Sequence, residues 1–113
     1  MSAQPREIRR YITSEGKILI DEWLNSFRDS KTKAIINARV NRVKNGNLGD
    51  YRSLGESIYE LKINYGSGYR VYFANVGSEI ILLLHGGDKS TQDRDIRKAK
   101  EYWRDYEQRE NFY

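Results

Sequence analysis

Three basic residues in the second half of the chain have the types and the spacing to hold a phosphodiester. Lys62 and Arg70 lie in two neighbouring segments of alternating apolar and polar residues, and Lys89 follows the glycine pair Gly86-Gly87. We expect Lys62 and Arg70 to be diagonal neighbours on an exposed sheet face. Lys89 should stand at the start of a helix, where backbone N–H groups favour phosphate. Such a cluster would stabilise the charge that develops when a phosphodiester is cleaved.

The nucleophile for such a cleavage must come from the substrate, because the chain offers little catalytic chemistry of its own. It has one histidine and no cysteine, so neither a metal nor another cofactor is expected. RNA carries a nucleophile in its 2′-hydroxyl and DNA does not, so a metal-free cationic site favours RNA. His85 is the candidate general acid, since its ordinary pKa lies near neutrality.

Each of these residues also has a structural interpretation that the sequence leaves open. Arg70 could pair with Glu60 or stack on Tyr72. Lys62 is equally consistent with a solvated lysine, and a lone histidine at the end of an apolar strand, such as His85, is more often a satisfied core residue. Tyr72 could orient a base or a phosphate of RNA, or it could only pack on the sheet.

A second basic group precedes the predicted sheet. Between Lys31 and Leu54 there are six basic residues and one acid, Asp50. This one-signed segment is consistent with a ridge that follows RNA phosphates and, equally, with an ordinary solvated helix face. On the first interpretation the RNA-binding candidates are Arg39, Arg42, Lys44 and Arg52.

Hydrophobic periodicity indicates an α+β fold around these residues. The expected strands are Glu7–Thr13, at an edge of the sheet, then Ile58–Asn64, Tyr69–Ala74 and Glu79–His85. The expected helices are Lys17–Arg28, Thr32–Asn45 and a C-terminal helix that begins at a capping box of Ser90 and Asp93. A loop with three glycines, Asn45–Gly55, joins the helical hairpin to the sheet. We therefore expect two layers, with the hairpin on a mainly antiparallel sheet of about four strands, closed by the C-terminal helix.

The strands at the centre of the sequence are expected to form a hairpin around Gly66-Ser67-Gly68. If Tyr65 pairs with Tyr69 across that turn, Lys62 lies opposite Tyr72. The apolar run Glu79–His85 should then be a central strand covered on both faces, ending at the turn formed by Gly86-Gly87.

Composition sets broad limits on the class of protein. The 113 residues fit one domain, residues 1–113, and the net charge of +4 favours an anionic partner, although many proteins of this basicity bind none. The absence of cysteine fits a reducing cytoplasm. Neither a signal peptide nor a membrane-spanning segment is expected.

Three segments carry a specific pattern when they are read in order. They are ELKI at residues 60–63, GYRVYF at residues 68–73 and LLHGGDKSTQDRDI at residues 83–96, and the pattern extends upstream through NGNLGDYRSLG at residues 45–55. In this order the chain resembles the RelE/ParE superfamily of bacterial toxins. It resembles more closely the HigB-like branch, the addiction module killer proteins.

The resemblance implies a RelE-like fold and the toxin of a type II toxin–antitoxin pair, partnered by a cognate antitoxin that is often of helix-turn-helix type. It also implies an mRNA interferase that cuts translated mRNA in the ribosomal A site by attack of the 2′-hydroxyl. Arg70 then matches the arginine that contacts the scissile phosphate, with Lys89 as a second stabilising cation and Lys62 as candidate base or further contact. The chain departs from the pattern at Glu60, on a strand where RelE-type enzymes carry several basic residues.

Two other functions remain open at this point. ParE-like members share the expected fold but poison DNA gyrase without cutting RNA, and the cations retained at Lys62, Arg70 and Lys89 argue against that function. A non-catalytic RNA- or ribosome-binding module would instead use the basic segment, so that Arg39 and Arg42 would matter more than Arg70.

Overall fold

The computed structural model describes residues 5–110, which form a five-stranded sheet with three α-helices. The strands are β1 (Glu7–Arg10), β2 (Tyr51–Gly55), β3 (Ile58–Ile63), β4 (Tyr69–Val76) and β5 (Ile80–Asp88). The helices are α1 (Leu19–Asn25), α2 (Ser30–Lys44) and α3 (Gln92–Glu110), and a 3₁₀ turn, η1 (Lys89–Thr91), precedes α3. The α+β class is confirmed, and the architecture is compatible with the RelE-like fold that the resemblance implied.

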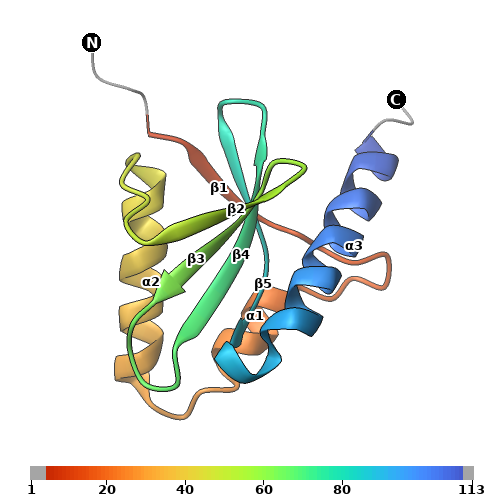
Figure 1. Cartoon of the computed structure of the whole chain (residues 1–113). Coiled ribbons are helices and arrows are strands. Elements are labelled where there is room, and N and C mark those ends of the chain that lie inside the picture. The colour runs from red at the N-terminus through yellow and green to blue at the C-terminus, as the bar shows by residue number, and fades with distance from the viewer. Residues whose placement is uncertain (1–4, 111–113) are drawn as a thin grey trace.

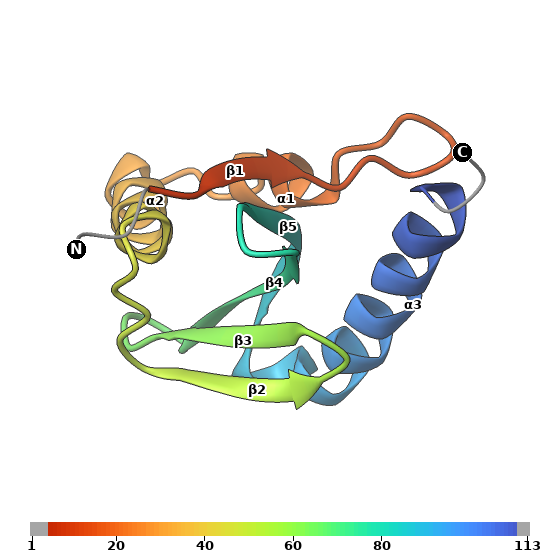
Figure 2. The same cartoon turned by 90° about the horizontal axis from the view of Figure 1, so that it is seen from above.

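The strand order is β1-β5-β4-β3-β2, with β1 parallel to β5 and the other pairs antiparallel. The N-terminal strand is therefore at an edge, as predicted, and β5 lies inside the sheet. Figures 1 and 2 show α2 and α3 on opposite sides of the strands, so that α3 adds a helical layer to the two layers expected. No helix within residues 5–110 is long and apolar enough to cross a membrane.

The two faces of the sheet form separate apolar cores. On one face, Ile20 of α1 and Ile36, Val40 and Val43 of α2 pack against odd-numbered residues of β3 and β4, such as Leu61. On the other face, the Ala99 and Trp103 side chains of α3 pack against even-numbered residues of β3 and β4. Both helical layers thus bury apolar side chains against the sheet, and β5 is covered on both faces as expected.

The segment predicted as a loop between α2 and the hairpin is partly a strand. Tyr51–Gly55 pairs antiparallel with β3 and becomes the second edge of the sheet, which raises the strand count from about four to five. Its side chains are mostly exposed, so the segment lacks the apolar alternation by which a strand is recognised. The prediction of a loop across Asn45–Gly55 was wrong for these five residues.

The β3–β4 hairpin has a register two residues from the predicted one. Ile63 pairs with Tyr69 and Lys62 with Arg70, because Tyr65 belongs to the turn, where its N–H bonds Ile63 O and its own carbonyl accepts from Gly68. A shift of two residues keeps every side chain on its predicted face. It does change Lys62 and Arg70 from diagonal neighbours into direct partners.

The glycine pair is not the turn that the sequence suggested, since β5 continues through Gly86 and Gly87 to Asp88. A Cβ at Gly86 would lie 2.2 Å from Cε3 of Trp23, and a Cβ at Gly87 would lie 1.9 Å from Oδ2 of Asp95. Bare backbone therefore lets α1 and α3 approach β5 from opposite faces. The turn comes one residue later, where Asp88 and Thr91 form the capping box that was expected from Ser90 and Asp93.

Gly86→Ala should destabilise the fold through the Trp23 contact. Gly86 does not have a positive φ, so the loss would come from overpacking alone, and we expect about 1–3 kcal/mol in the free energy of unfolding. Urea unfolding measures it. In a Trp23→Leu background the same alanine should cost clearly less, because the ring is gone; an equal cost in both backgrounds would contradict this account.

Candidate phosphate-binding site

Two rows of side chains cross the face of the sheet that α3 covers. Register partners on β3, β4 and β5 form a first row of Glu60, Tyr72 and His85. The next row, at the end of the sheet nearest η1, consists of Lys62, Arg70 and Gly87. Residues two apart on a strand share a face, so both rows point the same way. The structure therefore brings Lys62 and Arg70 together.

Arg70 is held by the protein on two sides of its guanidinium. Nη1 donates a hydrogen bond of 2.7 Å to the carbonyl of Gly68, and Nε lies 3.7 Å from Oε2 of Glu60. The side chain is 12% exposed, so part of it reaches the surface. These contacts fix the plane of the guanidinium, whose rigid arrangement of N–H donors suits phosphate oxygens.

Lys89 lies at the same end of the sheet as Arg70. A Cβ at Gly68 would stand 3.3 Å from Nη1 of Arg70 and 3.9 Å from Cβ of Lys89, so the three residues surround one point of the β3–β4 turn. Lys89 is exposed in η1, next to the start of α3. All three predicted phosphate-binding cations thus gather near the turn of the hairpin.

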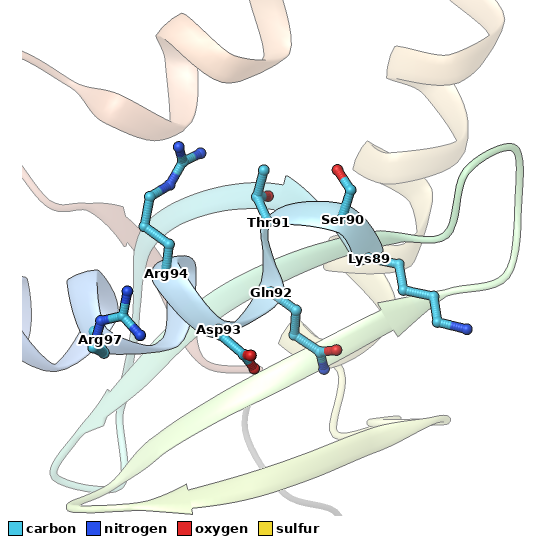
Figure 3. A pocket seen from close by; sticks show the side chains of 7 residues that line it. All are labelled: Lys89, Ser90, Thr91, Gln92, Asp93, Arg94 and Arg97. Carbon is cyan, nitrogen blue, oxygen red and sulfur yellow. The ribbon is translucent and has the colours of Figure 1, made fainter.

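A hollow of about 440 Å³ adjoins Lys89 on the surface of η1 and the first turns of α3 (Figure 3). In that view Lys89 and Arg94 extend away from the backbone in different directions, while Gln92 points toward β3. Three basic side chains and one acidic side chain are among those that line the hollow. The surface beside the cation cluster is therefore positive, which favours an anionic ligand. The lining residues are Lys89, Ser90, Thr91, Gln92, Asp93, Arg94 and Arg97.

Glu60 lies beneath the cations with no exposed surface. Its Oε2 accepts hydrogen bonds from the Tyr72 hydroxyl at 3.1 Å and from Nε2 of Gln92 at 2.9 Å. Its Oε1 lies 3.2 Å from Nη2 of Arg52, an ion pair without the alignment of a hydrogen bond. One buried carboxylate therefore joins β2, β3, β4 and α3.

Tyr72 is fully buried, which corrects the expectation that it lies on an exposed sheet face where it could touch RNA. Burial, with the Glu60 carboxylate beside it, raises the pKa of its hydroxyl, which therefore stays protonated and donates to Glu60. The Arg52 side chain is about half exposed (49%) while it pairs with Glu60. Of these two RNA-binding candidates, Arg52 alone has surface to offer a ligand.

His85 does not join the three cations. It stacks on Tyr72 with ring centroids 5.0 Å apart, and Nε2 lies 2.9 Å from the carbonyl of Asp95. Because a carbonyl only accepts, Nε2 carries the hydrogen. Burial lowers the pKa of His85, so the ring is neutral near pH 7. These contacts are those of a satisfied core histidine, the alternative that the sequence left open.

Arg39 has a different environment from the rest of the basic segment, because only 5% of its surface is exposed. Its Nη2 donates to the carbonyls of Leu48 and Asp50, and the guanidinium lies against Gly49, where no Cβ would fit. Burial lowers the pKa of Arg39. The side chain ties the segment before β2 to α2, so it does not lie on the predicted ridge.

Arg42 and Lys44 are exposed at the C-terminal end of α2, as a phosphate-binding ridge requires. Arg42 borders a second hollow, of about 380 Å³, which Lys62 also lines. This hollow connects the basic end of α2 with the end of β3. Within residues 5–110 no group of three histidine, cysteine or carboxylate side chains is placed to hold a metal ion.

Sequence reasoning missed Glu60 and Gln92 as members of the site. The sequence indicates Glu60 as a possible partner of Arg70 and as a departure from the RelE pattern, because the predicted register places it opposite Ala74, whereas in the structure it pairs with Tyr72. No local pattern in the sequence marks Gln92, since its contact with Glu60 of β3 follows from the packing of α3. The alternation of Glu60 with Lys62 was the available signal, because it assigns both residues to one face.

Comparison with known proteins identifies a family for this arrangement. Residues 22–104, from α1 into α3, match the model of the family described as Phage derived protein Gp49-like. The matched segment includes Lys62, Arg70 and Lys89. The chain is also 48% identical over 83 residues to an uncharacterized protein of Haemophilus influenzae, an alignment that covers 74% of this chain and 84% of that protein.

Acidification should destabilise the fold through His85. Its pKa is lowered in the fold, so the unfolded chain binds a proton first and stability falls as the pH drops below the ordinary value of 6.5. Urea unfolding between pH 7.5 and pH 5 measures the loss. In His85→Gln, which can still donate to Asp95, the loss should be smaller; an unchanged pH dependence would refute the assignment.

Arg39→Met should cost about 1.5–3 kcal/mol of stability, because it removes charge-assisted hydrogen bonds to two carbonyls. Arg42→Met is the matched control, since Arg42 is exposed on the same helix, and it should change stability by less than about 0.5 kcal/mol. Denaturant unfolding of both variants tests this. Equal losses would mean that the Arg39 contacts do not stabilise the segment before β2.

Proposed function

Because the chain belongs to the family of Gp49-like phage-derived proteins, which is associated with toxins of toxin–antitoxin systems, we propose that it is the toxin of such a pair and cleaves mRNA. It would be a metal-independent endoribonuclease of the HigB-like branch of the RelE/ParE superfamily. Its substrate would be translated mRNA in the ribosomal A site, and its partner a cognate antitoxin of helix-turn-helix type.

The observation that carries this proposal is the position of three basic residues at one end of the sheet. Lys62 and Arg70 are direct register partners, and Nη1 of Arg70 and Cβ of Lys89 both lie near the position of Gly68. Three like charges repel one another in the free protein. A phosphodiester relieves that repulsion, most of all when it carries the extra charge of a pentacoordinate transition state.

In the proposed reaction the RNA supplies the nucleophile. The 2′-oxygen attacks the adjacent phosphorus as its proton departs, and a new P–O2′ bond forms. The P–O5′ bond then breaks and the leaving oxygen takes up a proton, so that the products are a 2′,3′-cyclic phosphate and a 5′-hydroxyl. Arg70 and Lys89 stabilise the developing negative charge, and Lys62 supplies a further electrostatic contact. His85 has no step here, since its Nε2 is engaged by Asp95.

Arg70→Ala should reduce cleavage by about 100- to 1000-fold, the typical loss on removal of one donor to a developing charge. The assay is a cell-free translation reaction with purified protein, in which the 5′ ends of the mRNA are mapped, with naked mRNA in a parallel lane. New ends on translated message only, lost in Arg70→Ala, would support the proposal.

Arg10→Ala is the matched control, because Arg10 is an arginine of β1 at the far edge of the sheet and pairs with Asp21; it should cleave like the wild type. Intact mRNA with normal translation would overturn the nuclease and lead to a gyrase supercoiling assay, in which a ParE-like poison would be active. Intact mRNA with blocked translation would indicate a non-catalytic ribosome-binding module.

A further inference from the structure

Among residues 5–110, Glu60 is the acid that forms an ion pair with the cluster, through Nε of Arg70, and it is fully buried. Four side chains from three other elements approach its carboxylate at distances of 2.9–3.7 Å. Gln92 and Tyr72 donate hydrogen bonds to it. Arg52 and Arg70 form ion pairs with its oxygens.

The fold itself gives little reason to keep a carboxylate at this position. A charged group without exposed surface is costly to bury, and a well-packed apolar residue often stabilises such a site as much or more. Ile58, the residue before Glu60 on the same face of β3, shows the contrast, since it packs in the apolar core. What the charge adds to this position is its effect on the two arginines that pair with it.

The two ion pairs restrain both arginine heads. Nε of Arg70 lies toward Oε2 of Glu60 while its Nη1 is bound to Gly68. Nη2 of Arg52 lies at Oε1, on the opposite side of the carboxylate. The negative charge also reduces the repulsion between the two guanidinium groups, which would otherwise drive these long side chains apart.

We propose that Glu60 is a positioning residue, which holds Arg70 against the scissile phosphate of the RNA and Arg52 against a neighbouring phosphate. The inference rests on the proposed nuclease function. Glu60 does not touch the substrate, because it has no exposed surface. It acts through Arg70, which is 12% exposed, and Arg52, which is 49% exposed.

Glu60→Gln is the direct test, because it removes the charge and keeps the shape and an oxygen for the Tyr72 hydroxyl. In the cell-free translation assay we expect cleavage to fall by about 10- to 100-fold, as for other supporting contacts of a reacting group. Binding of RNA with a 2′-deoxy residue at the scissile position should not weaken, because the site becomes more positive. Glu56→Gln is the matched control, since Glu56 is exposed and pairs with Arg104, and it should cleave like the wild type.

A combination with Arg70→Lys separates positioning from a general loss of folded protein. If Glu60 acts through Arg70, Glu60→Gln should reduce cleavage far less in the Arg70→Lys background than in the wild type. An equal reduction in both backgrounds, or full activity of Glu60→Gln, would overturn the inference and leave the nuclease intact. A wild type that does not cleave would overturn the proposed function and this inference with it.

Tyr72→Phe covers the case in which Glu60→Gln does not fold. It deletes the hydroxyl that donates to Glu60 at 3.1 Å and keeps the ring that stacks on His85. Cleavage should fall severalfold, by less than in Glu60→Gln. Tyr102→Phe is its control, because Tyr102 packs on His85 from α3, and it should not change cleavage. Equal activity of the two variants would overturn the inference.

Discussion

The bare backbone of β5 at Gly86 and Gly87 is the constraint on which the rest of the arrangement depends. Trp23 and Asp95 occupy, on opposite faces, the space that two side chains would need. Because α3 docks this closely, its first turn reaches across the sheet, where Gln92 bonds Glu60 and η1 brings Lys89 beside the hairpin turn. The missing Cβ atom at Gly87, where Asp95 and Thr91 approach the strand, therefore helps to set the position of Lys89, the first residue of η1.

Electrostatics at this end of the molecule combine one buried negative charge with several positive charges above it. The carboxylate of Glu60 lies within 3.7 Å of two guanidinium groups, which lowers their mutual repulsion without neutralising the surface. The remaining positive potential acts on ligands through solvent, so its strength depends on ionic strength. The same residues thus provide both direct contacts with a ligand and a long-range attraction for anions. Salt weakens the long-range attraction much more than the direct contacts.

Periodicity predicted most elements because their apolar residues repeat at intervals that only one type of structure can bury, as in the stripe of Ile36, Val40 and Val43. It could not reveal Tyr51–Gly55 as a strand, since an exposed edge has no buried side to mark it. The pairing of Lys62 with Arg70 could be predicted only if the length of the turn were known, because Tyr65 belongs to the turn and not to the strand. Arg39 and Glu60 are buried by segments that are distant in the sequence, so the residues next to them in the chain do not indicate their burial.

The parallel pairing of β1 with β5 has a consequence for the order of assembly during synthesis. The β2–β3–β4 meander can form as soon as its own residues are available, because its contacts are local. The first strand must wait for residues 80–83, and the hydrogen bond between Tyr11 and Asp105 joins positions 94 apart. The cations of the hairpin turn emerge before the segment that carries Lys89 and Gln92. A nascent chain therefore lacks the complete cluster until the segment from Lys89 to Gln92 has been made.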